Sequence, residues 1–529
     1  EADRRFADAS RLLDLPAARG RTHWLAGELT TLAGWVLASG RARLALDLAG
    51  RAVAAAETMP PDVPLFDAMH MLAEARIALG DRVGAGQVLD RQYALAQSAL
   101  PADHPRLARV YLDLATRAEL EARYEDAGRF AAEAAARFSR AHDASGVAEA
   151  GNQEAMAAIA LGRLEEAEAT LRAALAAADA AARGPTSVRR DILGNLSSTL
   201  HRAGRIAEAV AVGREALAVA ESLYGEGHPT TAPALNVLGL ALRRSERPGD
   251  AIPFLQRALA LRRIGDAADD PGLARAFSNL GSTLLAEGRI AEAAPLIERG
   301  AAVAEATLGP THPDITDALA PLADLRAALG DIREAEALQR RIVQILEAAF
   351  GPLHPALGAA LADLSGTMLA AGRTGDAIAL SRRAFQILAA ARPESHPQLV
   401  AARTALGEAL LAAGHPDEAG KVFAAALRAA EGRGEDGRES VVPALLGMAQ
   451  ARAAVLRGAE ALALAERALG VAGQRVGPAH PWTGAIRVLI AGLLADGQNI
   501  ADAERLYRDE IAARQQRLPS GTPALEFLK

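Results

Sequence analysis

Apolar residues recur every three or four positions along most of the chain, which is the spacing that places them on one face of an α-helix. Within residues 229–244, Leu235, Leu238 and Leu242 form one such stripe. A break at residues 247–249 follows, and a second stripe comes after it: Ala251, Leu255, Ala258 and Leu259. No segment shows the pattern of a β-strand. The sequence therefore predicts an all-α protein built from pairs of helices.

The helix pair repeats at a nearly constant interval. An alanine near the start of the second helix marks each repeat, as in Glu208-Ala209, Asp250-Ala251 and Glu292-Ala293. Its copies keep this 42-residue period at Ala335, Ala377, Ala419, Ala461 and Ala503, and they continue backwards, with two steps of 40, at Ala167, Ala127, Ala85 and Ala45. Such a period predicts an all-α solenoid of about twelve stacked helix-turn-helix units.

Two more markers keep the same register. A glycine stands five residues before the alanine in half of the units: Gly162, Gly204, Gly288, Gly330, Gly372 and Gly414. His-Pro pairs stand between units, at residues 104–105, 228–229, 312–313, 354–355, 396–397 and 480–481. Glycine suits the left-handed cap that ends a helix, and proline suits the first turn of the next. We expect these histidines to be structural, because one per unit cannot converge on a metal ion.

The stretch from Tyr224 to Gly239, with His228-Pro229 and Asn236 inside it and Asp250-Ala251 after it, carries a family resemblance. It resembles the tetratricopeptide repeat in its 42-residue form, which is found in kinesin light chains and many bacterial proteins. The resemblance covers residues 26–517 and implies a right-handed superhelix in which the first helix of each unit lines a concave groove. It implies no particular function, because this scaffold serves many roles.

The regularity of the markers divides the chain. It predicts a lead-in helix or cap over residues 1–25, divergent units one to four over 26–182, regular units five to ten over 183–431, units eleven and twelve over 432–517, and a tail over 518–529. The polar loop at 431–440 is either a hinge or a longer surface loop. The opening Glu1–Asp8 is also similar to the segment that precedes repeat arrays in some large bacterial receptor-type serine/threonine kinases. That resemblance implies the repeat tail of such a protein.

Composition narrows the possible functions. The chain has no cysteine, which excludes disulfides, thiolate metal sites and thiol catalysis. A net charge of −7 over 529 residues argues against nucleic acid as the main partner. No apolar run reaches the roughly 18 residues that cross a bilayer, so we expect no membrane insertion. The chain begins with Glu1 and no export signal follows, which indicates a processed product or a piece of a longer protein.

We expect no enzymatic activity, no cofactor and no metal ion. Gly420-Lys421-Val422 lacks the glycine spacing, the Ser or Thr and the preceding strand of a phosphate-binding loop. The motifs of serine hydrolases, zinc proteases and kinases are also missing from the sequence. Basic pairs such as Arg382-Arg383 have acids nearby and few aromatic residues to stack on bases, so solvated helix faces explain them better than nucleic-acid contact.

Binding is expected on the first helices of units five to seven. An asparagine amide offers donors and an acceptor for the main chain of a peptide, and an arginine pairs well with a carboxylate. The resemblance implies this role for Asn195 and Asn279, and the alternative is that the asparagines hydrogen-bond the adjacent helix. Units eight to ten carry Pro321, Asp363 and Ala405 instead. The candidate residues are Asn195, Ser198, His201, Arg202, Asn236, Arg243, Arg244, Asn279 and Ser282.

Two functional hypotheses follow. In the first, the chain is a non-enzymatic scaffold that binds a peptide segment or a partner protein in its concave groove. In the second, it is a sensory or assembly module of a larger bacterial signalling protein, working through self-association or its convex face. We expect a cytoplasmic location, or the exported side of a membrane if the chain is a receptor-kinase tail.

Overall fold

The computed structural model describes residues 22–38, 41–58, 63–79, 81–182, 184–243, 248–263, 271–433, 438–475 and 481–517. Within these ranges the chain forms twenty-four α-helices and three short 3-10 turns, and no strand. The all-α prediction is therefore confirmed. The predictions for residues 1–21, for residues 434–437 of the polar loop and for the tail at 518–529 lie outside the described residues.

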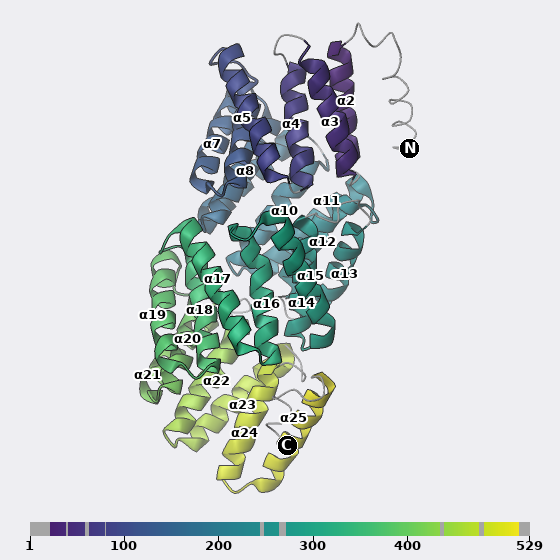
Figure 1. The fold of residues 1–529 in the computed structure, drawn as a ribbon. Coiled ribbons are helices and arrows are strands. Elements are labelled where there is room, and N and C mark those ends of the chain that lie inside the picture. Colours follow the sequence, from purple (N-terminus) through teal and green to yellow (C-terminus); the bar gives the residue numbers. More distant parts are fainter. Residues whose placement is uncertain are drawn as a thin grey trace.

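The helices form twelve consecutive pairs, which confirms the predicted repeat (Figure 1). We call the first helix of each pair helix A, the second helix B, and the link between them the A–B turn. In order, the pairs are α2 (Thr22–Ala38) and α3 (Ala42–Ala56); α4 (Val63–Ala78) and α5 (Arg82–Ala99); α6 (Leu107–Leu120) and α7 (Tyr124–Arg140); α8 (Ala144–Ala160) and α9 (Leu164–Ala181); α10 (Ser187–Arg202) and α11 (Ile206–Tyr224); α12 (Ala232–Arg243) and α13 (Ala251–Arg262); α14 (Pro271–Ala286) and α15 (Ile290–Leu308); α16 (Thr316–Leu329) and α17 (Ile332–Phe350); α18 (Pro355–Ala370) and α19 (Thr374–Ala391); α20 (Pro397–Ala412) and α21 (Pro416–Glu431); α22 (Arg438–Ala454) and α23 (Gly458–Arg475); α24 (Pro481–Asp496) and α25 (Ile500–Arg517).

The glycine and histidine markers act at the ends of helices. The A–B turn glycines Gly204 and Gly330 have φ angles of +78° and +90°, a conformation that glycine adopts without a Cβ clash. Several described histidines of the His-Pro pairs are N-caps: the Nδ1 atoms of His312 and His354 accept hydrogen bonds from the backbone amides two residues later, at 3.1 and 3.2 Å. His396 does the same at 3.3 Å. Their predicted structural role is therefore confirmed.

The marker alanines lie at the centre of each helix-pair contact. Ala209, Ala251, Ala293, Ala335 and Ala377 are all 0% exposed, so no larger side chain would fit without moving a helix. Leucines from neighbouring units then fill the space between pairs, and one apolar cluster runs without interruption from α11 to α16. The core is thus a continuous band along the solenoid rather than a single centre.

The solenoid curls until units distant in sequence touch. The ring of Tyr124 on α7 stacks on the ring of Phe350 on α17, with 5.7 Å between their centroids. Arg82 on α5 reaches His312, and Arg392 reaches the carbonyl of Gly162, each across 230 residues. In Figure 1 the lower end of the α7–α8 region accordingly meets the upper end of the α17–α19 region. We call this line of contacts the seam; it brings each A–B turn of units three to five against the His-Pro region about five units later.

A substitution at Gly281 tests the close packing within a unit. A Cβ atom at this position on α14 would lie 2.5 Å from Cγ1 of Ile297 and 3.2 Å from its backbone nitrogen. We expect Gly281→Ala to lower the free energy of unfolding by about 1–2 kcal/mol, because overpacking outweighs the gain in helix propensity. Gly366→Ala on α18 is the matched control, since nothing lies within 4 Å of its Cβ, and it should stabilise by about 1 kcal/mol. Urea unfolding followed by far-UV circular dichroism measures both; equal stabilisation by the two alanines would contradict the tight packing.

Candidate functional site

A row of polar side chains runs along the middle of the A helices and links them in pairs. Each pair joins two successive A helices through one contact of 2.8 to 3.1 Å, and its members lie 43 residues apart. We call this row the polar ladder and its three pairs rungs. The rungs are His70–Asp113 between α4 and α6, Asn152–Asn195 between α8 and α10, and Asn236–Asn279 between α12 and α14.

The asparagine rungs combine the two predicted alternatives. Asn195 donates from Nδ2 to Oδ1 of Asn152 at 2.9 Å, and Asn279 donates to Asn236 in the same way at 3.1 Å. The asparagines therefore do hydrogen-bond the adjacent A helix. Each rung still has one amide NH₂ and one carbonyl oxygen for which the described residues provide no partner, and all four side chains are half-buried. A rung thus presents a fixed donor and a fixed acceptor side by side.

The histidine rung carries charge. Nδ1 of His70 lies 2.8 Å from Oδ1 of Asp113, whose side chain is only 4% exposed and whose Oδ2 finds no hydrogen-bond partner among the described residues. Burial disfavours the imidazolium, but the charge and hydrogen bond of Asp113 outweigh it and raise the pKa of His70 to about 9. Arg109 and Glu149 form an ion pair of 2.6 Å beside this rung. The rung is therefore an ion pair at neutral pH.

Sequence reasoning missed His70, Asp113 and Asn152. All three lie in units two to four, where the two shorter steps shift the register and the residue type changes from one unit to the next. The spacing of 43 residues from Asn195 to Asn152, and from Asp113 to His70, was the available signal. It becomes visible only when helix A positions are aligned unit by unit.

The other predicted residues lie around the ladder without forming rungs. Ser282 donates to the backbone carbonyl of Ser278, and Ser198 is half-buried on α10. His201 and Arg243 are half-buried, whereas Arg202 is exposed. Arg244 lies outside the described residues. The structure thus brings Asn195 and Asn279 into rungs, each with an asparagine of the preceding unit, and it places Arg202 and Arg243 near carboxylates of unit eight instead.

In units eight to ten, carboxylates lie at the asparagine position of the ladder, as Asp363 does, or one helical turn from it. Asp317 and Asp324 on α16, Asp363 on α18 and Glu408 on α20 are accessible to solvent, yet they are surrounded by protein on many sides. Both properties together describe the wall of a concave surface. Among the described residues none of the four has a hydrogen bond or an ion pair from its carboxylate. We call these four residues the acidic row.

The protein that surrounds the acidic row raises the pKa values of its carboxyl groups. Burial raises the pKa of Asp324 to about 6, although the charge of Arg243 opposes the shift. Burial, assisted by the nearby charge of Asp324, raises the pKa of Asp363 to about 7. Burial alone raises the pKa of Glu408 to about 7. Arg202 acts on Asp317 as Arg243 acts on Asp324, so units five and six face unit eight across the concave side.

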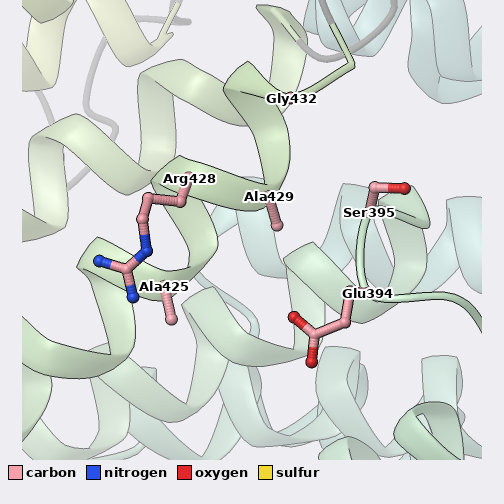
Figure 2. Close-up of a pocket in the computed structure, with 6 residues that line it drawn as sticks. All are labelled: Glu394, Ser395, Ala425, Arg428, Ala429 and Gly432. Atoms are coloured by element: carbon pink, nitrogen blue, oxygen red, sulfur yellow. The ribbon is translucent and has the colours of Figure 1, made fainter.

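A shallow pocket lies apart from the ladder (Figure 2). It holds about 300 Å³ between the loop before α20 and the end of α21, and it is lined by Glu394, Ser395, Ala425, Arg428, Ala429 and Gly432. Figure 2 shows the carboxylate of Glu394 and the guanidinium of Arg428 on opposite sides. Glu394 is already paired with Arg403 at 2.8 Å. This pocket is open and has no convergent polar groups, so the ladder is the better candidate site.

Two further properties concern ions and membranes. No three His, Asp or Glu side chains of the described ranges are grouped so that they could hold a metal ion. None of the described helices is both long and apolar enough to cross a membrane.

Comparison with known proteins identifies a repeat family. Four segments, which overlap in two pairs, match the tetratricopeptide repeat, at residues 146–221, 188–264, 272–348 and 314–390. Similar solved structures include two of a Podosopora anserina protein described as a kinesin light chain with nearly identical TPR-like repeats. Both are 22% identical, with TM-scores of 0.32 and 0.31, and they cover 39% and 40% of this chain and 99% of theirs. BtubC (BKLC) from P. vanneervenii is 19% identical over 44% of this chain and 91% of its own, with a TM-score of 0.33. No curated protein matches the sequence.

The His70–Asp113 rung makes stability depend on pH. Because the pKa of His70 is raised in the folded state to about 9 from an ordinary value of about 6.5, its contribution is complete below pH 6.5 and is lost as pH rises through 9. We expect the free energy of unfolding to fall by about 1–2 kcal/mol between pH 6.5 and 9.5, since the imidazole is partly solvated. Asp113→Asn should remove this slope, and it should lower the pKa of His70 measured by NMR titration. A slope that persists in Asp113→Asn would assign it to other groups.

Proposed function

The chain is a tetratricopeptide-repeat protein, and from this premise we propose that it is a protein-interaction scaffold that binds an extended segment of a partner along the polar ladder. The supporting observation is the pairing of asparagines on successive A helices at fixed spacing. A rung holds each amide in place before a ligand arrives, so little side-chain entropy is lost on binding. The scaffold itself performs no chemistry in this proposal.

The amide rungs suit the main chain of the ligand. A peptide unit has one N–H donor and one C=O acceptor, and a rung offers the complementary pair from Asn152 and Asn195 or from Asn236 and Asn279. Such contacts do not depend on the side chains of the ligand. The ladder would therefore fix the path of a bound segment, while its sequence preference comes from elsewhere in the groove.

The acidic row supplies that preference. Its four carboxylates, which have no partner among the described residues, face a confined part of the concave side, and a cationic side chain would relieve the cost of their partial desolvation. On α16, α18 and α20 they lie at the ladder position or one helical turn from it, toward the C-terminal end of the array. We therefore propose that the segment lays its main chain on units four to seven and basic side chains on units eight to ten.

A second candidate function is an assembly module that works through the end of the array. Trp24 and Trp35 lie on one face of α2, since their spacing is close to a whole number of helical turns, and they are 47% and 53% exposed. Exposed tryptophans on one face of a helix are a typical contact surface for another protein or another copy of the chain. This observation favours the signalling-module hypothesis independently of the groove.

Peptide selection on the full chain tests the ladder. Random 15-residue peptides displayed on phage are selected against the immobilised protein, and their affinity is measured by fluorescence anisotropy. We expect selected peptides rich in Arg and Lys, with binding that weakens as salt rises. The Asn152→Ala, Asn195→Ala, Asn236→Ala, Asn279→Ala variant should bind at least tenfold more weakly, because each lost hydrogen bond contributes about 1 kcal/mol.

Two sets of control variants test whether the loss of peptide affinity is specific to the ladder. Gln256→Ala and Arg299→Ala change exposed positions on B helices, and they should leave affinity unchanged. Asp317→Asn, Asp324→Asn, Asp363→Asn and Glu408→Gln together should abolish the preference for basic peptides while keeping the ladder. Equal binding by the native chain and the asparagine variant, at unchanged helical content, would refute the ladder as the site. Concentration-dependent oligomers in the absence of any selected peptide would support the assembly module instead.

A further inference from the structure

The seam joins two turns of the superhelix in three steps, one in each of three successive units. Each step places an A–B turn from residues 82–204 against a His-Pro region from residues 312–433. The steps share one geometry because the unit repeats. Their chemistry shows how firmly the two turns are held together.

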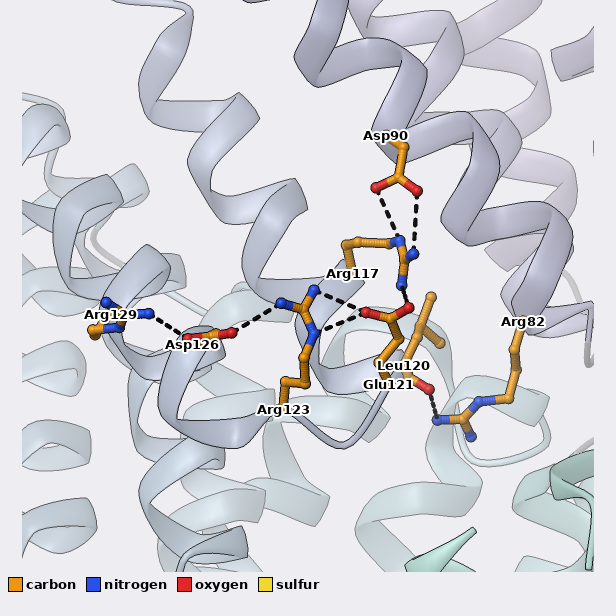
Figure 3. Close-up of polar contacts among 8 residues, drawn as sticks. All are labelled: Arg82, Asp90, Arg117, Leu120, Glu121, Arg123, Asp126 and Arg129. Atoms are coloured by element: carbon orange, nitrogen blue, oxygen red, sulfur yellow. Dashed lines mark hydrogen bonds and ion pairs between the residues drawn. The ribbon is translucent and has the colours of Figure 1, made fainter. Parts of the chain in front are cut away.

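The first step centres on His312. Arg82 donates from Nη2 to the carbonyl of Leu120 at 3.2 Å, and the same nitrogen lies 2.8 Å from Nε2 of His312. Figure 3 shows Arg82 beside a chain of ion pairs that ties α5, α6 and α7 together, through Asp90, Arg117, Glu121, Arg123, Asp126 and Arg129. These ion pairs connect three successive helices of the earlier turn at this point.

The second step centres on His354. Its imidazole stacks on Phe350 at 4.4 Å, and Phe350 stacks in turn on Tyr124 of the earlier turn. Its buried Nε2 faces the backbone carbonyls of Ala160 and Leu161 without a hydrogen bond of good geometry. Arg392 completes this step by donating to the carbonyl of Gly162 at 2.7 Å.

The third step repeats the arginine contact. Arg433 donates to the carbonyl of Gly204 in the earlier turn, and also to that of Ser395 at 2.9 Å in its own turn. Gly204 lies so close to the later turn that a Cβ atom would stand 2.3 Å from Nη2 of Arg433 and 2.6 Å from Cγ of Pro397. Only glycine allows the two turns to approach in this way.

The seam contains no apolar core. Each apolar cluster of the described residues follows the chain from one unit to its neighbours, and none joins residues 82–204 directly to residues 312–433. The two turns are thus held by arginine–carbonyl hydrogen bonds, ring stacking and histidine contacts. Separating them exposes little apolar surface, whereas separating neighbouring units would expose much.

The histidines of the first two steps are used in their neutral form. Nδ1 of His312 lies 3.1 Å from the amide nitrogen of Asp314, and its Nε2 lies 2.8 Å from Nη2 of Arg82; both neighbours are donors, and a neutral imidazole accepts from one of them whereas an imidazolium accepts from neither. Nδ1 of His354 accepts from the amide of Ala356. Protonation therefore breaks the cap of α18, and at His312 it sets an imidazolium against an arginine.

The charged surroundings of the two histidines differ. His312 faces Arg82, Glu119 and Tyr124 from the earlier turn and Asp314 from its own, and burial followed by the charge of Arg82 keeps its pKa low although Asp314 opposes. His354 faces Arg392, which has Glu165 nearby, and burial again lowers its pKa. Lowered histidine pKa values mean that the open state binds more protons, so acid favours opening.

We propose that the seam is an acid-sensitive latch: protonation of His312 and His354 separates the two superhelical turns and opens the concave side between them. The contacts that break are the polar ones described above, and the apolar contacts between neighbouring units stay intact. Opening would therefore be a change in superhelical shape without unfolding of helices. The latch does not depend on which ligand the groove binds.

Pulsed electron paramagnetic resonance on the full chain tests the latch. Because the chain has no cysteine, Glu166→Cys on α9 and Leu353→Cys beside His354 place two nitroxide labels on opposite sides of the seam. We expect one short, narrow distance distribution at pH 8, and a longer and broader one at pH 5, below the ordinary histidine pKa of about 6.5. Circular dichroism should show unchanged helicity at both values. A distribution that is the same at pH 8 and pH 5 would overturn the proposal.

A non-titrating variant assigns the effect to the histidines. His312→Asn with His354→Asn keeps an oxygen that can cap each helix, but it removes the titrating rings. The doubly labelled variant should stay closed at pH 5. If it opens as the native chain does, the acid response belongs to other groups, such as the acidic row, and the latch is refuted.

A pair of glycine variants tests whether the seam holds the turns together. Gly204→Ala and Gly372→Ala impose the same strain, because both glycines have positive φ angles, of +78° and +74°. Only the Gly204 Cβ would meet the opposite turn; nothing lies within 4 Å at Gly372. Gly204→Ala should give the longer distance already at pH 8, and Gly372→Ala should not. A short distance in both variants would contradict the close approach at the third step.

Discussion

The rest of the structure depends on the close contact between helix pairs at the marker alanines. Residues such as Ala209 and Ala251 are completely buried where one helix crosses another, so the distance and angle between the helices are fixed by backbone proximity. Because the same contact recurs once in every unit, the same small rotation is applied at each step. The accumulated rotation brings a unit back against another about five units later. Both the ladder and the seam are consequences of that accumulation.

The sequence predicted the structural features that depend only on residues within one unit. Helix periodicity, turn glycines, N-capping histidines and packing alanines each act within a single unit. Because these signals recur in the successive units, the sequence predicted the helix pair repeatedly. The positions of Asn195 and Asn279 on the A helices followed from the same register. Their bond to the preceding unit was one of two alternatives, and the structure shows it with Asn152 and Asn236 as partners.

The seam could not be predicted because it joins residues 230 positions apart, and no single residue marks it. Arg392 and Arg433 are two arginines among many in the sequence. Whether they meet a carbonyl of an earlier turn depends on the summed rotation of five units, and a small error in the rotation of each unit would separate the turns altogether. The His70–Asp113 rung was not predicted for another reason. Its register is displaced by the two shorter steps of the repeat, and its residue types differ from those of the amide rungs.

The histidines of the His-Pro pairs act both within their own unit and across the seam. In one unit, His354 caps its own helix through Nδ1, which explains its place in the repeat. In the folded superhelix, the same ring also stacks in the seam, and burial there lowers its pKa. The carboxylates of Asp363 and Glu408 change in the opposite sense, since enclosure raises their pKa values to about 7. As pH falls through about 7, the acidic row therefore loses negative charge, and acid also favours the protonated form of the seam histidines. Under the two proposals, both changes weaken the hold on a basic segment, so release and opening would be driven by one variable.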